Sequence, residues 1–92
     1  PPAAPSNLRI VAIGNNYLTI GWNDNSSNET GFEIQRSSTA GGPWTTVATV
    51  PTNTTRYRDN GLGRRTTRYY QIRSVNGFGT SGWIGPVSGT TR

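Results

Sequence analysis

The sequence contains no cysteine and no histidine, and these two absences exclude several kinds of chemistry at once. Without thiols there can be no disulfide bonds, and without both residue types there are no Cys/His zinc sites and no Ser-His-Asp triads. The only carboxylates are Asp24, Glu29, Glu33 and Asp59. Glu29 and Glu33 lie close together in sequence, but a domain of 92 residues has no room for the deep cleft of a glycosidase. We therefore predict that the chain is not an enzyme and uses no cofactor.

Long apolar runs and helical repeats are also missing. No run approaches the roughly 20 residues that cross a membrane, so we expect no membrane partner. There is no methionine, and the chain opens with Pro-Pro-Ala-Ala-Pro, which is typical of a piece of a longer protein. Proline restricts the backbone, so we assign residues 1–6 to a stiff linker and residues 7–92 to one domain.

Short apolar runs with a period of two make up most of the chain. Such alternation places apolar side chains on one face of a sheet, and strands recurring every 8–12 residues are typical of a sandwich. We predict an all-β, immunoglobulin-like sandwich of seven strands in two antiparallel sheets. One strand should run over residues 44–50 at a sheet edge, where Pro51 ends it, and the last within residues 84–91. The predicted core is Leu8, Ile10, Leu18, Ile20, Trp22, Phe32, Ile34, Tyr57, Leu62, Tyr70 and Ile72.

The order and spacing of these runs resemble one family. The ordered set is Pro5-x-x-Leu8-x-Ile10, Leu18-x-Ile20-x-Trp22, Phe32-x-Ile34-x-Arg36, Tyr57-x-Asp59-x-x-Leu62 and Tyr70-x-Ile72-x-Ser74-Val75-Asn76. It resembles a fibronectin type III domain over about residues 5–92. The stretch from Trp22 to Ser37 is similar to the version found in secreted and surface proteins of bacteria, such as polysaccharide-degrading enzymes.

One position departs from the family pattern. The resemblance implies a tyrosine six residues after Leu62, where it would form the tyrosine corner, but Arg68 stands there. Tyr69 is adjacent and should point to the opposite face. Either Arg68 replaces the corner residue or a local irregularity turns Tyr69 inward, and we favour the replacement.

The loop after Trp22 is rich in oxygen-bearing side chains. Asp24, Glu29 and the residues between them offer ligands that calcium prefers. The same short polar side chains can instead bond to their own backbone and hold a turn. We favour the turn and predict no metal.

All nine cationic side chains are arginine, and the formal net charge is +5. Arginine binds carboxylate, sulfate and phosphate through a planar fork. Strand alternation places Arg9, Arg56 and Arg58 on the outer face of one sheet and Arg73 on the outer face of the other. Because the charges are distributed over the molecule, we predict no nucleic-acid partner. Weak contact with an anionic polymer or a neighbouring domain stays open.

Two tryptophans have no assigned place in the core. Trp44 follows a Gly-Gly-Pro break, and Trp83 follows Gly82, with Gly85 two residues further on. Each can cap an open end of the sandwich or form an exposed platform for a sugar ring. Together with Arg64 and Arg65 they are our candidates for polymer or partner contact.

Together with the resemblance, these observations favour a monomeric, non-catalytic module of a larger secreted or cell-surface protein. We expect it to act as a rigid spacer between neighbouring domains, and the resemblance implies that the larger protein is carbohydrate-active. The first alternative is a carbohydrate- or polymer-binding module that uses exposed tryptophan and arginine. The second is an adhesion or receptor module that binds another protein. For the spacer we expect weak polysaccharide binding or none.

Overall fold

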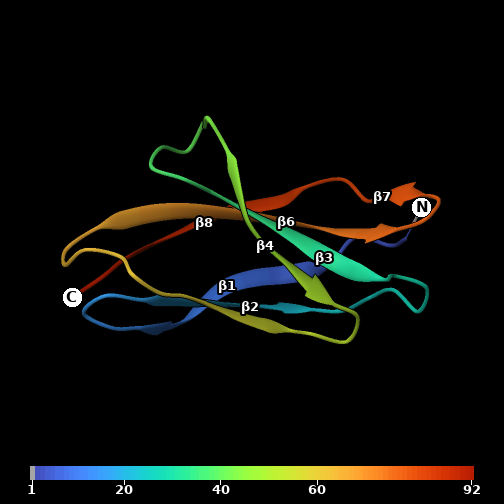
Figure 1. Cartoon of the computed structure of the whole chain (residues 1–92), viewed down its shortest axis with the longest axis horizontal. Coiled ribbons are helices and arrows are strands. Elements are labelled where there is room, and N and C mark those ends of the chain that lie inside the picture. Colours follow the sequence, from blue (N-terminus) through green and yellow to red (C-terminus); the bar gives the residue numbers. More distant parts are fainter. Residues whose placement is uncertain (1) are drawn as a thin grey trace.

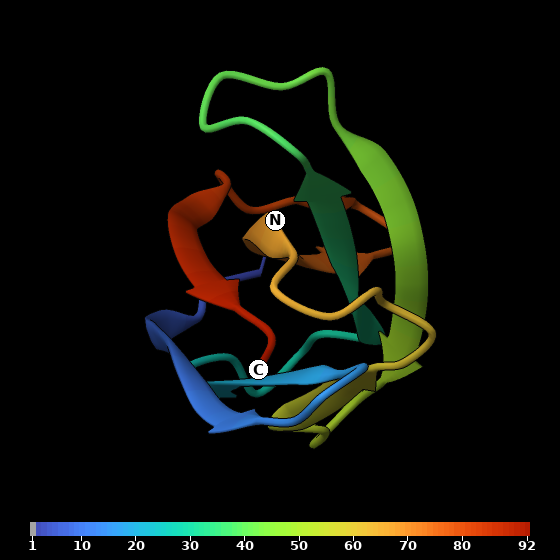
Figure 2. The same cartoon turned by 90° about the vertical axis from the view of Figure 1, so that its left-hand side faces the viewer.

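The computed structural model describes residues 2–92, and this part of the chain forms eight β-strands and no helix. The strands are β1 (Ser6–Ile13), β2 (Leu18–Asn23), β3 (Gly31–Ser37), β4 (Thr45–Pro51), β5 (Arg56–Asp59), β6 (Thr67–Asn76), β7 (Gly79–Thr80) and β8 (Ile84–Thr90). They pair into two antiparallel sheets. The smaller sheet has the order β1-β2-β5, and the larger runs β4-β3-β6, with β7 and β8 both pairing with β6. Figure 2 shows the two sheets facing each other, which confirms the predicted all-β sandwich.

Alternation along the strands builds the core between the sheets. In β2 the residues Leu18, Ile20 and Trp22 are buried, and the two residues between them belong to the other face. The Trp22 and Phe32 rings meet edge to face with centroids 5.6 Å apart, a geometry that aromatic pairs prefer. The buried apolar residues are Leu8, Leu18, Ile20, Trp22, Phe32, Ile34, Leu62, Tyr70 and Ile72, while Ile10 and Tyr57 are half-buried and pack against them.

The strand count differs from the predicted seven. The extra strand is β7, whose two residues pair with Val75 and Asn76 of β6 across a tight turn. The backbone N–H of Phe78 donates to Oδ1 of Asn76 (2.8 Å), which holds this turn. A strand of two residues has no alternation, so its sequence contains no pattern that predicts it.

Strand β4 forms one edge of the larger sheet, as the nearby proline suggested. It runs from Thr45 to Pro51, one residue later at each end than the predicted range. Pro51 is the last residue of the strand, opposite Gly31 of β3. Proline has no N–H to donate, and at the edge of the sheet this costs no hydrogen bond between interior strands.

Residues 2–5 pack on the sandwich. Pro2 and Pro5 are buried, and the side-chain amide of Asn25 donates to the carbonyl of Ala4 (3.1 Å). Ser6, assigned to the linker from sequence, is the first residue of β1. The division into a linker at 1–6 and a domain at 7–92 stays a prediction.

The molecule is elongated, measuring 39 × 23 × 19 Å along its principal axes. In Figure 1 the first described residues lie near β7, and the C-terminus lies at the opposite end of the long axis. The sandwich therefore separates the two ends of its own chain by most of its length.

Candidate functional site

The candidate contact residues Arg64, Arg65 and Trp44 lie on different connections. Arg64 and Arg65 are exposed between β5 and β6, where the backbone N–H of Arg65 donates to the carbonyl of Arg92 (3.4 Å). Trp44 precedes β4 and is half-buried. Its ring lies against Gly42, where an added Cβ would approach Cδ1 of the indole to 2.9 Å. Trp44 therefore packs on its own loop, away from the connection that holds the two arginines.

Trp83, the fourth candidate, packs against β6. The guanidinium carbon of Arg73 lies 4.3 Å from the centroid of the Trp83 ring, and the indole is half-buried. This is a cation–π contact, and the arginine covers one face of the indole. A sugar ring cannot stack on that face unless Arg73 moves. The sequence left open whether Trp83 caps the sandwich or is exposed, and the structure shows this stacked arrangement.

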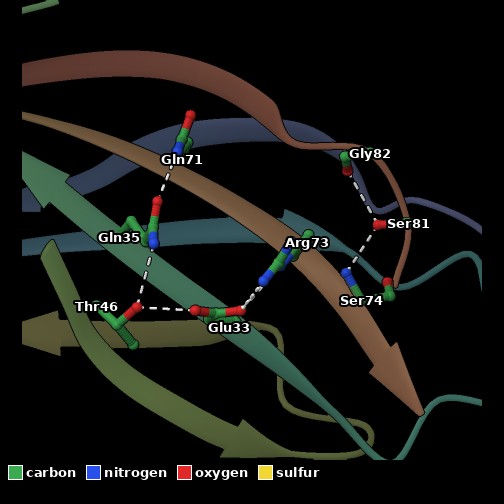
Figure 3. Close-up of polar contacts among 8 residues, drawn as sticks. All are labelled: Glu33, Gln35, Thr46, Gln71, Arg73, Ser74, Ser81 and Gly82. Atoms are coloured by element: carbon green, nitrogen blue, oxygen red, sulfur yellow. Dashed lines mark hydrogen bonds and ion pairs between the residues drawn. The ribbon is translucent and has the colours of Figure 1, made fainter. Parts of the chain in front are cut away.

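A continuous chain of polar contacts crosses the outer face of the larger sheet (Figure 3). The amide of Gln71 donates to Gln35 (2.8 Å), the amide of Gln35 to Thr46 (3.2 Å), and the Thr46 hydroxyl to Oε2 of Glu33 (2.8 Å). The other oxygen of Glu33 accepts from Nε of Arg73 (2.8 Å). We call these five residues the outer polar chain; they tie β4, β3 and β6 together.

The contacts of the outer polar chain keep the Glu33 carboxyl group ionised. Burial alone would raise the pKa of Glu33, but the hydrogen bonds from Thr46 and Arg73 and the charge of Arg73 lower it below its usual 4.5. Glu33 is therefore ionised at neutral pH, and both of its oxygens are occupied. The outer polar chain is suited to stiffening the sheet, because its groups bond to one another.

A second charged group lies between the sheets. Asp59 on β5 is buried, and Nη1 of Arg36 on β3 contacts both of its carboxylate oxygens at 2.9 Å. The hydroxyl of Tyr70 on β6 donates to Oδ2 of the same carboxylate (2.5 Å). Burial and the negative charge of Asp59 raise the pKa of Tyr70 well above its usual value. The sequence motifs contained all three residues, but nothing in them showed that the three would meet.

At the tyrosine-corner position the strand register is regular. Tyr70, Ile72 and Ser74 of β6 are fully buried, so Arg68 has the inward parity and Tyr69 the outward one. Nη1 of Arg68 donates to the carbonyl of Thr67 (2.8 Å). The alternation therefore gives the inward position to Arg68 and not to Tyr69, and the replacement of the corner tyrosine by Arg68 stays a prediction.

Asp24 and Glu29 are neighbouring carboxyl groups in the β2–β3 loop, and each affects the pKa of the other. Burial and the hydrogen bond to Glu29 raise the pKa of Asp24, whereas bonds from Asp24, Thr52 and the backbone outweigh burial and lower the pKa of Glu29 to about 2. Oδ1 of Asp24 accepts the backbone N–H of Ser26 (3.0 Å), and Oε1 of Glu29 accepts from Thr52 (2.8 Å). These hydrogen bonds stabilise the conformation of the loop. Residues 2–92 contain no group of three or more acidic, histidine or cysteine residues placed to hold a metal.

Two further residues were not among the sequence candidates. Phe78, at the tip of the β6–β7 turn, is 93% exposed. Thr91, just after β8, is 3% exposed and bonds to the β5–β6 connection. An isolated phenylalanine between two glycines indicates this exposure weakly, and the role of Thr91 depends on a partner far away in sequence.

The described residues enclose no pocket and include no helix long and apolar enough to cross a bilayer. Two facing antiparallel sheets around an edge-to-face Trp–Phe core define an immunoglobulin-like β-sandwich module. The fibronectin type III domain family matches residues 3–90, and the chain belongs to that family. Domains of this family are generally non-catalytic and commonly occur in extracellular or surface proteins.

Solved structures share this fold. An Fn3-like protein from Clostridium thermocellum is 30% identical, with a TM-score of 0.80, and the match covers 95% of this chain and 90% of that one. A β-1,2-glucanase from Parabacteroides distasonis is 24% identical, with a TM-score of 0.86 over 99% of this chain, but the match covers only 13% of the glucanase. FN3tt is 21% identical, with a TM-score of 0.82 and coverage of 98% and 94%.

Proposed function

We propose that this chain is a non-catalytic, monomeric spacer module of a larger secreted or cell-surface protein, and that the larger protein acts on carbohydrate. The glucanase whose structure contains a similar sandwich as a small part of its length supports this setting. The observation that carries the proposal is mechanical. Both ends of the described chain are tied to the body of the sandwich, and they lie at opposite ends of its long axis.

The C-terminal tie centres on Thr91. Its hydroxyl donates to the carbonyl of Gly63 (2.6 Å) and accepts the backbone N–H of Thr66 (2.8 Å). Its own N–H donates to the Thr66 carbonyl (3.0 Å), and the next residue, Arg92, donates to the carbonyl of Gly14 (2.9 Å). The two residues that follow β8 are therefore bonded to the β5–β6 connection and to the β1–β2 connection.

The opposite end is tied through the β2–β3 loop. Asn25 bonds to Ala4, and the side-chain amide of Asn76 donates to the carbonyl of Asn28 (3.2 Å), which joins this loop to the β6–β7 turn. With the outer polar chain crossing the larger sheet, a displacement at one end is transmitted through bonded elements to the other. This is the property that a spacer requires.

Distance measurements between spin labels test the rigidity directly. The absence of cysteine means that Ala3→Cys and Arg92→Cys, both at exposed positions, give two unique labelling sites. We expect one narrow distance distribution in the isolated module. Thr91→Val should broaden it, because the variant loses two hydrogen bonds of the tie. A broad distribution in the otherwise unchanged chain would contradict the spacer.

Co-sedimentation with insoluble cellulose and chitin separates the spacer from the polymer-binding alternative. We expect the module to stay in the supernatant, because Trp44 and Trp83 are half-buried and lie on different connections, before β4 and before β8. Two separate aromatic contacts of about 1–3 kcal/mol do not offset the freedom lost on binding. Tight retention that is lost in Trp44→Ala or Trp83→Ala, with the fold intact, would establish the alternative.

A second candidate function, contact with another protein domain, rests on Phe78. The Asn76 side chain holds the β6–β7 turn, and the Phe78 ring in it is 93% exposed. Figure 1 shows β7, which follows this turn, at the end of the molecule where the chain begins. Hydrogen exchange of residues 76–80 in the intact larger protein tests it. A contact predicts protection relative to the isolated module, and equal exchange argues against one.

A further inference from the structure

Three arginines lie on the outer face of the smaller sheet, on the side away from the core. Arg9 of β1 and Arg56 of β5 are both paired with Gly21 of β2, one on each side. Neighbouring strands are about 4.8 Å apart, so the two arginine backbones flank the glycine at about 10 Å from each other. Arg58 lies two residues further along β5, opposite Thr19, and therefore on the same face.

Gly21 leaves the centre of this face without a side chain. A Cβ there would lie 2.9 Å from Cγ1 of Val11 and 3.7 Å from the guanidinium carbon of Arg9. The Arg9 side chain therefore extends over the glycine, and its Nη1 donates to the carbonyl of Asn7 (2.9 Å). Gly21 itself is buried beneath the Val11 and Arg9 side chains, and one guanidinium is already ordered on this face.

The other two guanidinium groups are more exposed. Arg58 lies over the ring of Tyr17, with its guanidinium carbon 4.1 Å from the ring centroid. This contact orients the planar fork while the side chain remains exposed. Arg56 is exposed, and within residues 2–92 its side chain has no hydrogen bond or ion pair to a protein group.

The carboxylates of the chain are engaged elsewhere. Asp59 is paired with Arg36 between the sheets, and Glu33 with Arg73 on the opposite outer face. The remaining two, Asp24 and Glu29, lie in the β2–β3 loop, where they accept hydrogen bonds from the backbone N–H of Ser26 and the hydroxyl of Thr52. Within the described chain, no carboxylate forms an ion pair with the three arginines, so this face carries a large part of the net charge of +5.

We propose that this arginine face (Arg9, Arg56 and Arg58 around Gly21) binds a linear acidic polysaccharide through its carboxylate or sulfate groups. Guanidinium forks bind such groups in bidentate geometry, and a repeating acidic polymer presents them in series. Because the arginines lie on β1 and β5, on either side of β2, a polymer that contacts all three must lie across the strands. Nucleic acid fits less well, because single-strand binding uses free aromatic faces and Arg58 covers a face of Tyr17, the aromatic residue here.

Binding to immobilised polygalacturonate, which bears carboxylates alone, and to heparin, which adds sulfates, tests the proposal. Dextran is the neutral control. Arg56→Gln/Arg58→Gln and Arg64→Gln/Arg65→Gln form a matched pair, since each removes two positive charges from exposed positions. We expect salt-sensitive binding of the unchanged chain to at least one acidic polymer, and an affinity about tenfold lower for the Arg56/Arg58 variant. The Arg64/Arg65 variant should change it less than about twofold.

The control measurements decide the remaining outcomes. Thermal melts should show that both double variants keep the fold, and Arg9→Gln should weaken binding in the same direction as the Arg56/Arg58 variant. Equal losses in the two double variants would show that net charge alone drives binding and would overturn the proposal. The proposal also fails if neither acidic polymer binds at low salt, or if single-stranded DNA binds more tightly than both through the same arginines.

Discussion

The hydroxyl of Tyr70 on the larger sheet donates a 2.5 Å hydrogen bond to Oδ2 of Asp59 on the smaller one. The same carboxylate accepts from Arg36 through both oxygens. One buried acid therefore joins β5 to β3 and β6 across the sandwich. Removing one partner from a buried charged group costs more than removing a neutral hydrogen bond, because a charge loses its compensation.

The first prediction compares the partners of this carboxylate. Asp59→Ala should lower the free energy of unfolding by about 3 kcal/mol, since Arg36 and Tyr70 both lose their acceptor. Tyr70→Phe should cost only about 1–2 kcal/mol, because Arg36 still neutralises Asp59. Urea unfolding at pH 7 measures both. A loss in Asp59→Ala no greater than that in Tyr70→Phe would contradict the charge-based account.

The second prediction concerns alkaline pH. The pKa of Tyr70 is raised from 10.0 in the folded state, by burial first and then by its bond to Asp59. The unfolded chain therefore loses this proton first, so stability is constant below about pH 9 and falls as the pH rises past about 10. In urea unfolding from about pH 9 upwards, the free energy of unfolding should fall less steeply with pH for Tyr70→Phe than for the outward-facing control Tyr69→Phe. Parallel pH profiles would argue against it.

Prediction three ranks the tryptophans. Trp22 is 1% exposed and packs against Phe32, so Trp22→Ala should cost about 3–5 kcal/mol and leave the domain close to unfolding. Trp44→Ala and Trp83→Ala should cost less, because both rings are half-buried. Trp83→Ala also loses a cation–π contact worth about 0.5–1 kcal/mol. Equal losses at the three positions, measured by thermal and urea unfolding, would refute the ranking.

The fourth prediction concerns acid. The pKa of Glu29 falls from 4.5 to about 2 on folding, since hydrogen bonds from Asp24, Thr52 and the backbone outweigh burial. Stability from Glu29 is therefore present above about pH 4.5 and lost towards pH 2, while the raised pKa of Asp24 offsets part of it. Between pH 7 and pH 3, Glu29→Gln should therefore lose about 1 kcal/mol less unfolding free energy than the unchanged chain.

Unfolding in urea at pH 7 and pH 3 measures this difference. Melts with calcium and with EDTA are the control, and they should coincide because the loop is held by its own hydrogen bonds. A drop of several degrees on adding EDTA would instead indicate a metal at Asp24 and Glu29.

The fold could be predicted because its main determinant is local. Leu18, Ile20 and Trp22 share a face for the geometric reason that successive side chains of a strand alternate, and all three are buried. The same rule placed Arg9, Arg56 and Arg58 on one outer face, where the register puts them. Ile10 and Tyr57 also point towards the core but are only half-buried. Alternation gives a direction and does not measure how much a neighbouring element covers.

Contacts between distant residues could not be predicted in this way. Arg73 meets Trp83 only because β7 and the following segment fold back along β6. Thr91 bonds to Gly63 and Thr66 only because the end of β8 lies beside the β5–β6 connection. Asp59 was visible as part of a motif, but its partners come from two strands of the other sheet. These pairings depend on topology. The candidate contact residues, which were chosen by residue type alone, therefore lie on different connections and form no common site.

The last prediction is a stabilising substitution. Ser74 is fully buried in β6, and its hydroxyl has no hydrogen-bond partner among the described residues. Burying an unpaired hydroxyl costs about 1–3 kcal/mol, and alanine removes that cost while leaving a void of only one atom. Ser74→Ala should therefore raise the free energy of unfolding by about 1 kcal/mol.

The backbone N–H of Ser74 keeps its bond to the Ser81 hydroxyl (2.9 Å; Figure 3), so Ser81→Ala, which removes that acceptor, should lower stability by a similar amount. Urea unfolding of the two variants should thus give changes of opposite sign. A loss of stability in Ser74→Ala would mean that the buried hydroxyl is hydrogen-bonded after all.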